Sequence, residues 1–151
     1  MEQPIFLIGM MGAGKSHIGQ RLATRLSVPF IDTDTEIEKL AGQSIPQVFR
    51  EEGEASFREW ERKWVTSWQA VPAVVSTGGG LPTHHQLMRQ LKALGIVIYL
   101  SIDAPLAEDR LTGSNRPLWK GKEAWAALLQ ERETIYRQAH YTLDAARAEE
   151  D

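Results

Sequence analysis

Gly9-Met10-Met11-Gly12-Ala13-Gly14-Lys15-Ser16 follows directly after the apolar run 5–8, and its G-x-x-x-x-G-K-[ST] spacing is that of a phosphate-binding loop. The glycines let the backbone fold tightly enough for successive N–H groups to point inward at an anion. Apolar residues then recur at helical spacing across residues 15–26, which predicts a helix whose positive N-terminal end faces the same anion. The stretch therefore predicts a polyphosphate site between a strand and a helix.

Two side chains of this stretch have the chemistry for nucleotide binding. Lys15 would reach the β- and γ-phosphates, and the Ser16 hydroxyl would ligate Mg²⁺. A flexible strand-to-helix turn is the alternative interpretation. The complete motif in its strand and helix context argues against that alternative.

The composition restricts the remaining possibilities. A chain of 151 residues has the length of one domain, spanning residues 1–151. Its net charge of −3 argues against a nucleic-acid-binding surface, and its N-terminal sequence predicts neither a signal peptide nor a membrane span. Because there is no cysteine, no disulfide can form, which agrees with a cytoplasmic protein.

Short apolar runs rich in Ile and Val alternate with helical patterns, at residues 4–8, 29–31, 73–75 and 96–100. Residues 142–143 could add a short fifth strand. The alternation predicts an α/β fold of three layers, a short parallel sheet of about five strands flanked by helices as in P-loop NTPases. Ligands of such sheets bind beyond the carboxyl ends of the strands, so the polar residues there are the candidates for a site.

The second apolar run ends in Asp32-Thr33-Asp34, beside the predicted phosphate loop. If strand geometry continues that far, the spacing of two places both carboxylates on the same side. One would then face the metal or a substrate hydroxyl, and the other would hold the substrate. The alternative is that Asp34 or Thr33 only caps a helix that begins near Thr35.

Residues 44–70 predict two successive helices broken at Gly53. Arg58 and Glu61 lie three residues apart on the second, where Glu61 could hold a guanidinium suited to a substrate carboxylate. A solvated ion pair is the alternative. The helix also has an aromatic stripe that we interpret as core packing, formed by Phe57, Trp60, Trp64 and Trp68.

Three further segments have distinctive patterns. Gly78-Gly79-Gly80 follows the third apolar run, which favours a close approach of backbone to a ligand or neighbour over a plain loop. Residues 83–94 predict an amphipathic helix, and 145–151 a frayed tail. The histidines lack the spacing of a metal site and are interpreted as surface residues; they are His17, His84, His85 and His140.

Residues 112–122 are rich in Gly and Pro with three positive charges, a composition suited to a lid over an anion. The alternative is a solvated basic loop. Helices are predicted on either side, over 104–111 and over 123–139, and the second presents Arg132 and Tyr136.

Taken together, these motifs resemble those of the shikimate kinases over about residues 5–144. The phosphate loop is common to many nucleotide enzymes, whereas the combination of the other motifs is much more specific. In chain order they are GMMGAGKS at 9–16, DTD at 32–34, EGEASFREWE at 52–61, STGGG at 76–80, NRPL at 115–118 and ERETIY at 131–136.

The resemblance implies that ATP phosphorylates the 3-hydroxyl of shikimate, in aromatic amino-acid biosynthesis, on a monomer without nucleic-acid or membrane partners. It implies a substrate-binding helical region at about 34–62 and a lid at about 112–122. The residues implied to bind shikimate are Asp34, Arg58, Gly79, Gly80 and Arg132, with both arginines on its carboxylate. Those implied to bind ATP are Gly12, Ala13, Gly14, Lys15, Ser16, His17 and Arg116.

The same resemblance implies that three residues are catalytic: Lys15, Asp32 and the lid arginine Arg116. It also implies that Ser16 and Asp32 hold Mg²⁺. Two departures from the family pattern are Trp119 after the RPL motif, and a chain that stops at Asp151 where relatives usually continue through another helix.

Three other functions would explain part of the sequence. A kinase resembling the gluconate kinases would share the loop, but the FRxxE and GGG motifs favour an acceptor that has a carboxylate. A switch resembling small GTPases needs an N-K-x-D motif, whereas Asn115 is followed by Arg116. A kinase-like binding module without activity is disfavoured by the complete set of motif residues.

Overall fold

The computed structural model describes residues 2–112 and 121–148 and contains a five-stranded, wholly parallel sheet. The strand order is β2-β3-β1-β4-β5. The strands are β1 (Ile5–Ile8), β2 (Phe30–Asp32), β3 (Val74–Ser76), β4 (Ile96–Ser101) and β5 (Tyr141–Asp144). The predicted α/β class and the short fifth strand are thus confirmed.

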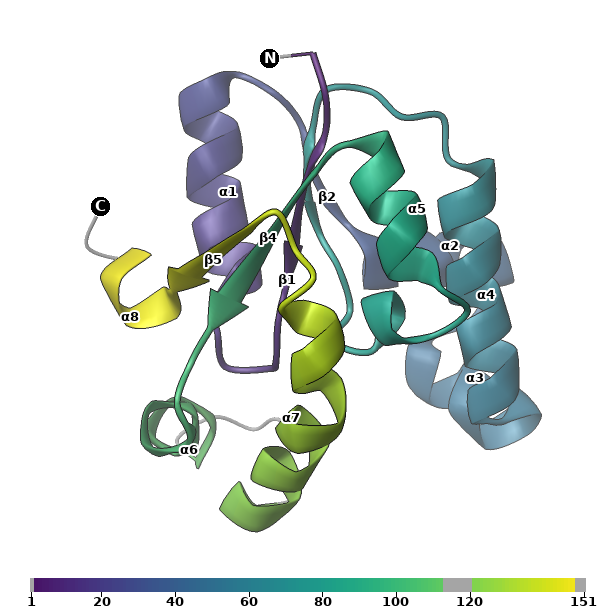
Figure 1. Cartoon of the computed structure of the whole chain (residues 1–151). Coiled ribbons are helices and arrows are strands. Elements are labelled where there is room, and N and C mark those ends of the chain that lie inside the picture. The colour runs from purple at the N-terminus through teal and green to yellow at the C-terminus, as the bar shows by residue number, and fades with distance from the viewer. Residues whose placement is uncertain (1, 113–120, 149–151) are drawn as a thin grey trace.

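Helices cover the sheet, with α1 and α5 on opposite sides and α2, α3 and α4 gathered in one group (Figure 1). No described helix is long and apolar enough to cross a membrane. The helices are α1 (Lys15–Leu26), α2 (Thr33–Ala41), α3 (Ile45–Glu52), α4 (Glu54–Ser67), the 3₁₀ turn η1 (Leu81–Thr83), α5 (Leu87–Leu94), α6 (Ala104–Thr112), α7 (Lys122–Tyr136) and α8 (Ala145–Ala148).

The aromatic stripe on α4 packs into the core, as predicted. Phe57 and Trp64 are buried, and Trp60 and Trp68 are partly buried against the core. Trp64 stacks on Trp68 with ring centroids 5.1 Å apart, and the Trp68 ring meets Phe6 of β1 edge-on. These contacts fix α4 against the sheet and so determine where its polar face points.

One helix prediction was wrong at its start, and the predicted frayed tail was wrong over residues 145–148. The helix predicted from Thr83 begins at Leu87, because Gly78–Thr83 form 3₁₀-type bonds and the backbone turns left-handed at His85 and Gln86. The tail predicted to fray forms the short helix α8 over 145–148, whose first turn is capped by Asp144 Oδ1 accepting from the Ala146 N–H at 3.0 Å. Residues 149–151 lie outside the described part of the chain.

The ends of three neighbouring strands are aligned in register. Leu7 of β1 pairs with Ser76 of β3, which pairs with Asp32 of β2. Thr77 reinforces the alignment, since its N–H and its hydroxyl both donate to Leu7 O at 3.1 Å. The three segments that leave these strands, each of which begins with or contains a predicted site motif, therefore start side by side.

Candidate active site

The loop between β1 and α1 has the backbone of an anion nest. Gly12 and Gly14 have φ values of 91° and 84°, a left-handed region that other residues rarely adopt, and Ala13 between them is buried. Helix α1 begins at Lys15 with no acidic residue in its first turn, so its positive end faces the loop uncompensated. The backbone geometry therefore fits the predicted phosphate site.

The Lys15 side chain lies along the inside of this loop. Its Nζ donates to Gly9 O at 2.7 Å and to Met10 O at 3.2 Å, which keeps the ammonium group within the nest. Ser16 and His17 follow in the exposed first turn of α1. A hydroxyl at this position, accessible beside the phosphates, fits the Mg²⁺ role predicted for Ser16.

Two side chains from distant helices also bond to the phosphate loop, and sequence reasoning did not find them. Arg110 Nη1 of α6 donates to Gly12 O at 2.8 Å, and Trp125 Nε1 of α7 donates to Met11 O at 3.1 Å. Trp125 is buried. Neither residue belongs to a recognisable local pattern, so only the tertiary structure reveals these contacts.

Asp32 is the N-cap of α2, which begins at Thr33 rather than near Thr35. Its Oδ1 accepts from the N–H of Asp34 at 2.9 Å and of Thr35 at 3.4 Å. The cap is therefore Asp32, not Asp34 or Thr33 as the alternative interpretation had it, and the strand does not continue to Asp34. Capping occupies only Oδ1 of the Asp32 carboxylate. Mg²⁺ in kinases needs only one or two carboxylates beside the phosphates. Asp32 and Ser16 therefore fit the predicted Mg²⁺ site.

The loop after β3 is the point where three residues predicted to bind the acceptor meet: Asp34, Arg58 and Arg132. A Cβ placed on Gly78 would lie 2.8 Å from Asp34 Oδ1, and one on Gly80 would lie 2.5 Å from Arg58 Nη1. A Cβ on Gly79 would lie 3.0 Å from Arg132 Nη1. Each of the three glycines thus leaves room for a different charged group, which favours the predicted close approach of backbone to a neighbour over a plain loop.

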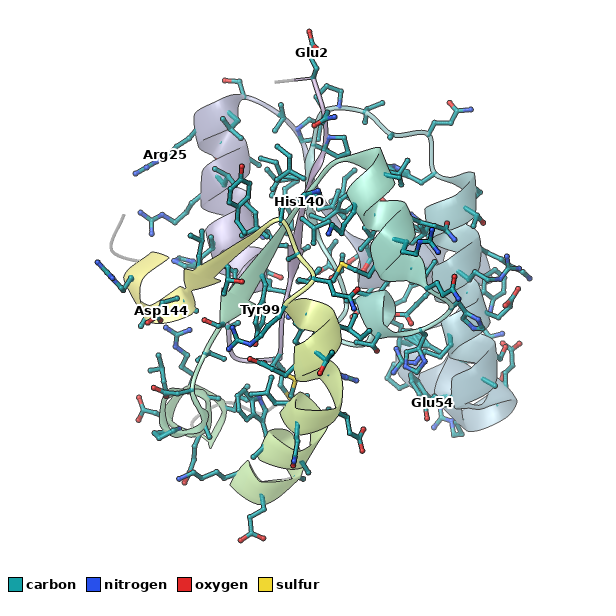
Figure 2. All side chains as sticks on the ribbon, in the orientation of Figure 1. Glu2, Arg25, Glu54, Tyr99, His140 and Asp144 are labelled. Atoms are coloured by element: carbon teal, nitrogen blue, oxygen red, sulfur yellow. The ribbon has the colours of Figure 1, made fainter. Side chains whose placement is uncertain are left out.

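Arg58 and Glu61 form a largely buried pair, so the alternative of a solvated ion pair is wrong. Arg58 Nη1 donates to Glu61 Oε1 at 2.8 Å, while the Glu61 side chain is about 1% exposed and that of Arg58 is 13% exposed. Arg58 Nη2 also lies 3.4 Å from Glu54 Oε1, at the N-terminal end of α4 where Figure 2 labels Glu54. Glu61 therefore fixes the direction of the guanidinium group.

Three buried polar atoms of this cluster have no hydrogen-bond partner among the described residues: Asp34 Oδ1, Arg58 Nε and Glu61 Oε2. Buried polar atoms normally have partners, so a group of exceptions at one place marks a site for a polar ligand. Two of the atoms are acceptors and one is a donor. That set suits a molecule that has both hydroxyl groups and an anionic group.

The two carboxyls of the cluster are difficult to ionise. Burial, together with the negative charge of Asp32, raises the pKa of Asp34 to about 6. Burial also raises the pKa of Glu61 to about 7, although the Arg58 hydrogen bond and charge oppose this change. Carboxyls with such pKa values are common where ligands bind or protons move.

Arg132 reaches the cluster from α7, together with a residue that sequence reasoning left without a role. Tyr136, one turn after Arg132 and fully buried, donates from its hydroxyl to Gly79 O at 2.5 Å. Met10 Sδ of the phosphate loop lies 3.9 Å from Arg132 Nη1 and 3.7 Å from Tyr136 Oη. The acceptor cluster and the phosphate loop are therefore in contact.

The structure thus brings together nearly all the predicted site residues. Lys15 lies near enough to Asp34 for its positive charge to oppose the rise in the pKa of Asp34 that burial causes, and Arg132 opposes the rise in the pKa of Glu61 in the same way. Gly9 O lies 3.4 Å from where a Gly79 Cβ would be, which joins the phosphate side to the acceptor side. Arg116 and most of the segment 112–122 lie outside the described residues.

Comparison with known proteins gives one consistent result. The family model described as shikimate kinase matches residues 11–151. A shikimate kinase of Persephonella marina is 41% identical over 138 residues, covering 89% of this chain and 84% of that protein. Among solved structures, the shikimate kinase of Bacteroides thetaiotaomicron superposes with a TM-score of 0.85 at 33% identity, covering 96% of this chain and 87% of that one. The shikimate kinase of Acinetobacter baumannii in complex with shikimate superposes with a TM-score of 0.83 at 35% identity, covering 98% and 89%.

Proposed function

The chain belongs to the shikimate kinase family, and we propose that it transfers a phosphoryl group from ATP to the 3-hydroxyl of shikimate in aromatic amino-acid biosynthesis. The observation that carries the proposal is the cup around Gly78–Gly80, where two arginines and an aspartate converge beside the phosphate loop. A small acid with several hydroxyls matches this cup in charge and in hydrogen bonding.

On the acceptor side, Arg58 and Arg132 bind the carboxylate, and Asp34 accepts from a ring hydroxyl. What supports these roles is that both guanidinium groups lie against the glycine loop, where Gly79 and Gly80 bring backbone close to the acceptor. Glu61 keeps Arg58 oriented through their 2.8 Å bond. A fixed, planar guanidinium can meet a carboxylate at two points, which positions the acceptor as well as binding it.

On the nucleotide side, the N–H groups of 12–16 and the Lys15 ammonium bind the phosphates, with His17 at the outer edge of the site. Ser16 and Asp32 would hold Mg²⁺, which would neutralise charge on the phosphates when bound. Asp32 also orients the reacting hydroxyl or accepts its proton. Arg116, in the lid at 112–122, would reach the transferred group, as the family pattern implies.

Phosphoryl transfer on this arrangement requires little covalent chemistry from the protein. The residues hold donor and acceptor in line, and Lys15 stabilises the negative charge that spreads over the transferred group. Water competes with the acceptor, so the cup and the lid must exclude it from the phosphate loop during transfer. Gly79 and Arg132 lie close to Gly9 and Met10 of the phosphate loop, which supports binding of the acceptor directly beside the phosphates.

We also propose that the enzyme is a cytoplasmic monomer, folded as one domain, with only small molecules as partners. The net charge of −3 supports the absence of a nucleic-acid partner, and the lack of cysteine agrees with the cytoplasm. Sedimentation at several concentrations measures the oligomeric state directly.

The function is tested by measuring ADP release from MgATP with and without shikimate, with Lys15→Ala as the control. We expect strong stimulation by shikimate in the parent chain and none in the variant. A parent chain that binds ATP but shows no stimulation would mean that another molecule is the acceptor. Gluconate in a parallel assay tests the nearest alternative acceptor.

A further inference from the structure

Tyr136 is a fully buried residue of α7 that lies one helical turn after Arg132 and contacts the glycine loop. Its hydroxyl donates to Gly79 O at 2.5 Å, although the two residues are 57 positions apart in the chain. Its ring packs against that of Tyr99 of β4, with centroids 5.0 Å apart, and Figure 2 shows Tyr99 beside the C-terminal end of α7. The hydroxyl is thus held by a rigid environment.

The glycine loop needs external contacts to keep one conformation, because glycine restricts the backbone least of all residues. The Gly78 N–H donates to Thr33 Oγ1 at 3.0 Å, and Gly80 O accepts from the Thr83 N–H and hydroxyl. The central carbonyl, Gly79 O, has one partner among the described residues, the Tyr136 hydroxyl. The Leu81 N–H also closes a turn on Gly78 O at 3.1 Å, but the Tyr136 bond is the one that acts directly on the carbonyl of the peptide between Gly79 and Gly80.

This peptide matters because of where its N–H points. No peptide among the described residues is cis, and in a trans peptide the N–H points opposite to the carbonyl. With Gly79 O held toward α7, the Gly80 N–H points away from α7. Neither the Gly79 nor the Gly80 N–H has a partner among the described residues, so both remain as donors beside Arg58 and Arg132.

We infer that Tyr136 is a positioning residue for the acceptor, which holds the Gly79–Gly80 peptide so that its N–H faces the bound shikimate. Arg132 and Tyr136 lie on one face of α7, so the same helix supplies a carboxylate ligand and fixes the loop opposite it. The inference rests on shikimate as the acceptor. It assigns to Tyr136 an effect on acceptor binding and none on the nucleotide.

Tyr136→Phe tests this role, because it removes the hydroxyl and keeps the ring on Tyr99. We expect the KM for shikimate to rise about five- to tenfold, the size expected for losing one buried hydrogen bond. The KM for ATP and kcat should remain within about twofold. The variant keeps the charged groups, and the only phosphate-loop contact of the hydroxyl among the described residues is the long 3.7 Å one to Met10 Sδ, a weak acceptor. An unchanged KM for shikimate, or a parallel rise of both KM values, would overturn the inference.

Tyr99→Phe is the matched control from the same pair of rings. The Tyr99 hydroxyl donates to Glu133 Oε2 at 2.7 Å and not to the loop, so its loss should leave both KM values within about twofold. A general loosening of the ring pair would instead raise the KM for shikimate equally in the two variants, and this would contradict the positioning role. Turnover of the parent chain with shikimate tests the acceptor itself, so a wrong acceptor and a wrong role for Tyr136 are distinguishable.

Should Tyr136→Phe be too unstable for assays at ordinary temperature, equilibrium titration in the cold decides the question. Intrinsic tryptophan fluorescence monitors the titrations, and circular dichroism shows that the variant is folded. We expect weaker shikimate affinity with ATP affinity preserved. Equal shikimate affinity in the variant and the parent would reject the role.

Discussion

The phosphate loop and the acceptor cup lie side by side, yet the chain builds them in opposite ways. The loop uses residues 9–16 in succession, and its nest depends on backbone conformations that those residues themselves favour. The cup takes Asp34, Arg58, Gly78–Gly80 and Arg132 from four segments that meet because the strand order is β2-β3-β1-β4-β5. The locally encoded site should therefore be impaired chiefly by substitutions within residues 9–16. The assembled site should be impaired by substitutions that remove the contacts between its segments.

The largest effect is expected at the locally encoded site, from Lys15→Ala. The ammonium group lies inside the nest on Gly9 O and Met10 O, and no other described lysine or arginine donates to those carbonyls. We expect kcat to fall by on the order of a thousandfold, the range observed when a charge that stabilises a transition state is removed. Steady-state ADP release measures it. The exposed Lys39→Ala on α2 serves as the control and should retain full turnover.

Arg58→Lys should have a smaller effect, confined to the assembled site. Lysine keeps the positive charge but cannot bond to Glu61 and a substrate carboxylate in the planar way of a guanidinium. We expect the KM for shikimate to rise about ten- to a hundredfold with a smaller change in kcat. Arg62→Lys is the matched control, since Arg62 lies one turn further on the same helix and pairs with Glu59 at the surface. A KM for shikimate equal to that of the parent would remove Arg58 from the carboxylate site.

The same contrast explains what could be predicted from the sequence. The phosphate loop, the strands and the pair Arg58 and Glu61 follow local patterns, so they were found. The burial of Glu61 was not predictable, because it depends on how α4 packs against other elements rather than on the spacing of the pair. Trp125, Arg110 and the Tyr136 hydroxyl bond to loops 57 to 114 residues away, and no periodicity reports such a contact.

Glu61→Gln tests how the buried Glu61 carboxyl of the assembled site makes the free energy of unfolding depend on pH. The pKa of Glu61 is raised to about 7, so between its ordinary pKa near 4.5 and pH 7 the folded protein binds more protons than the unfolded chain. The free energy of unfolding must therefore fall as the pH rises through that window. Asp34, with its pKa raised to about 6, acts in the same direction over a lower range.

Because glutamine does not titrate, Glu61→Gln should remove one part of this pH dependence. We expect its Tm relative to the parent to increase between pH 5 and pH 8 by a few degrees, equivalent to about 1–2 kcal/mol. Thermal unfolding followed by circular dichroism across that range measures it. Glu59→Gln, on the exposed side of the same helix, should give a Tm difference that does not vary in this way. A Tm difference for Glu61→Gln that is constant with pH would contradict a raised pKa.

The smallest effect is expected from Trp125→Phe. This variant tests whether the phosphate loop keeps its conformation through residues 9–16 alone. Trp125 Nε1 donates to Met11 O at 3.1 Å from α7, so part of the loop is held by a residue 114 positions away. Phenylalanine keeps most of the buried ring but loses this bond, so the KM for ATP should rise about two- to fivefold while that for shikimate is unchanged. Trp60→Phe, on α4 away from the loop, is the control and should change neither KM. An unaffected KM for ATP would mean that residues 9–16 hold their conformation unaided. A measurable rise would instead make α7 common to both sites, since the helix that positions Arg132 in the cup would also support the nest.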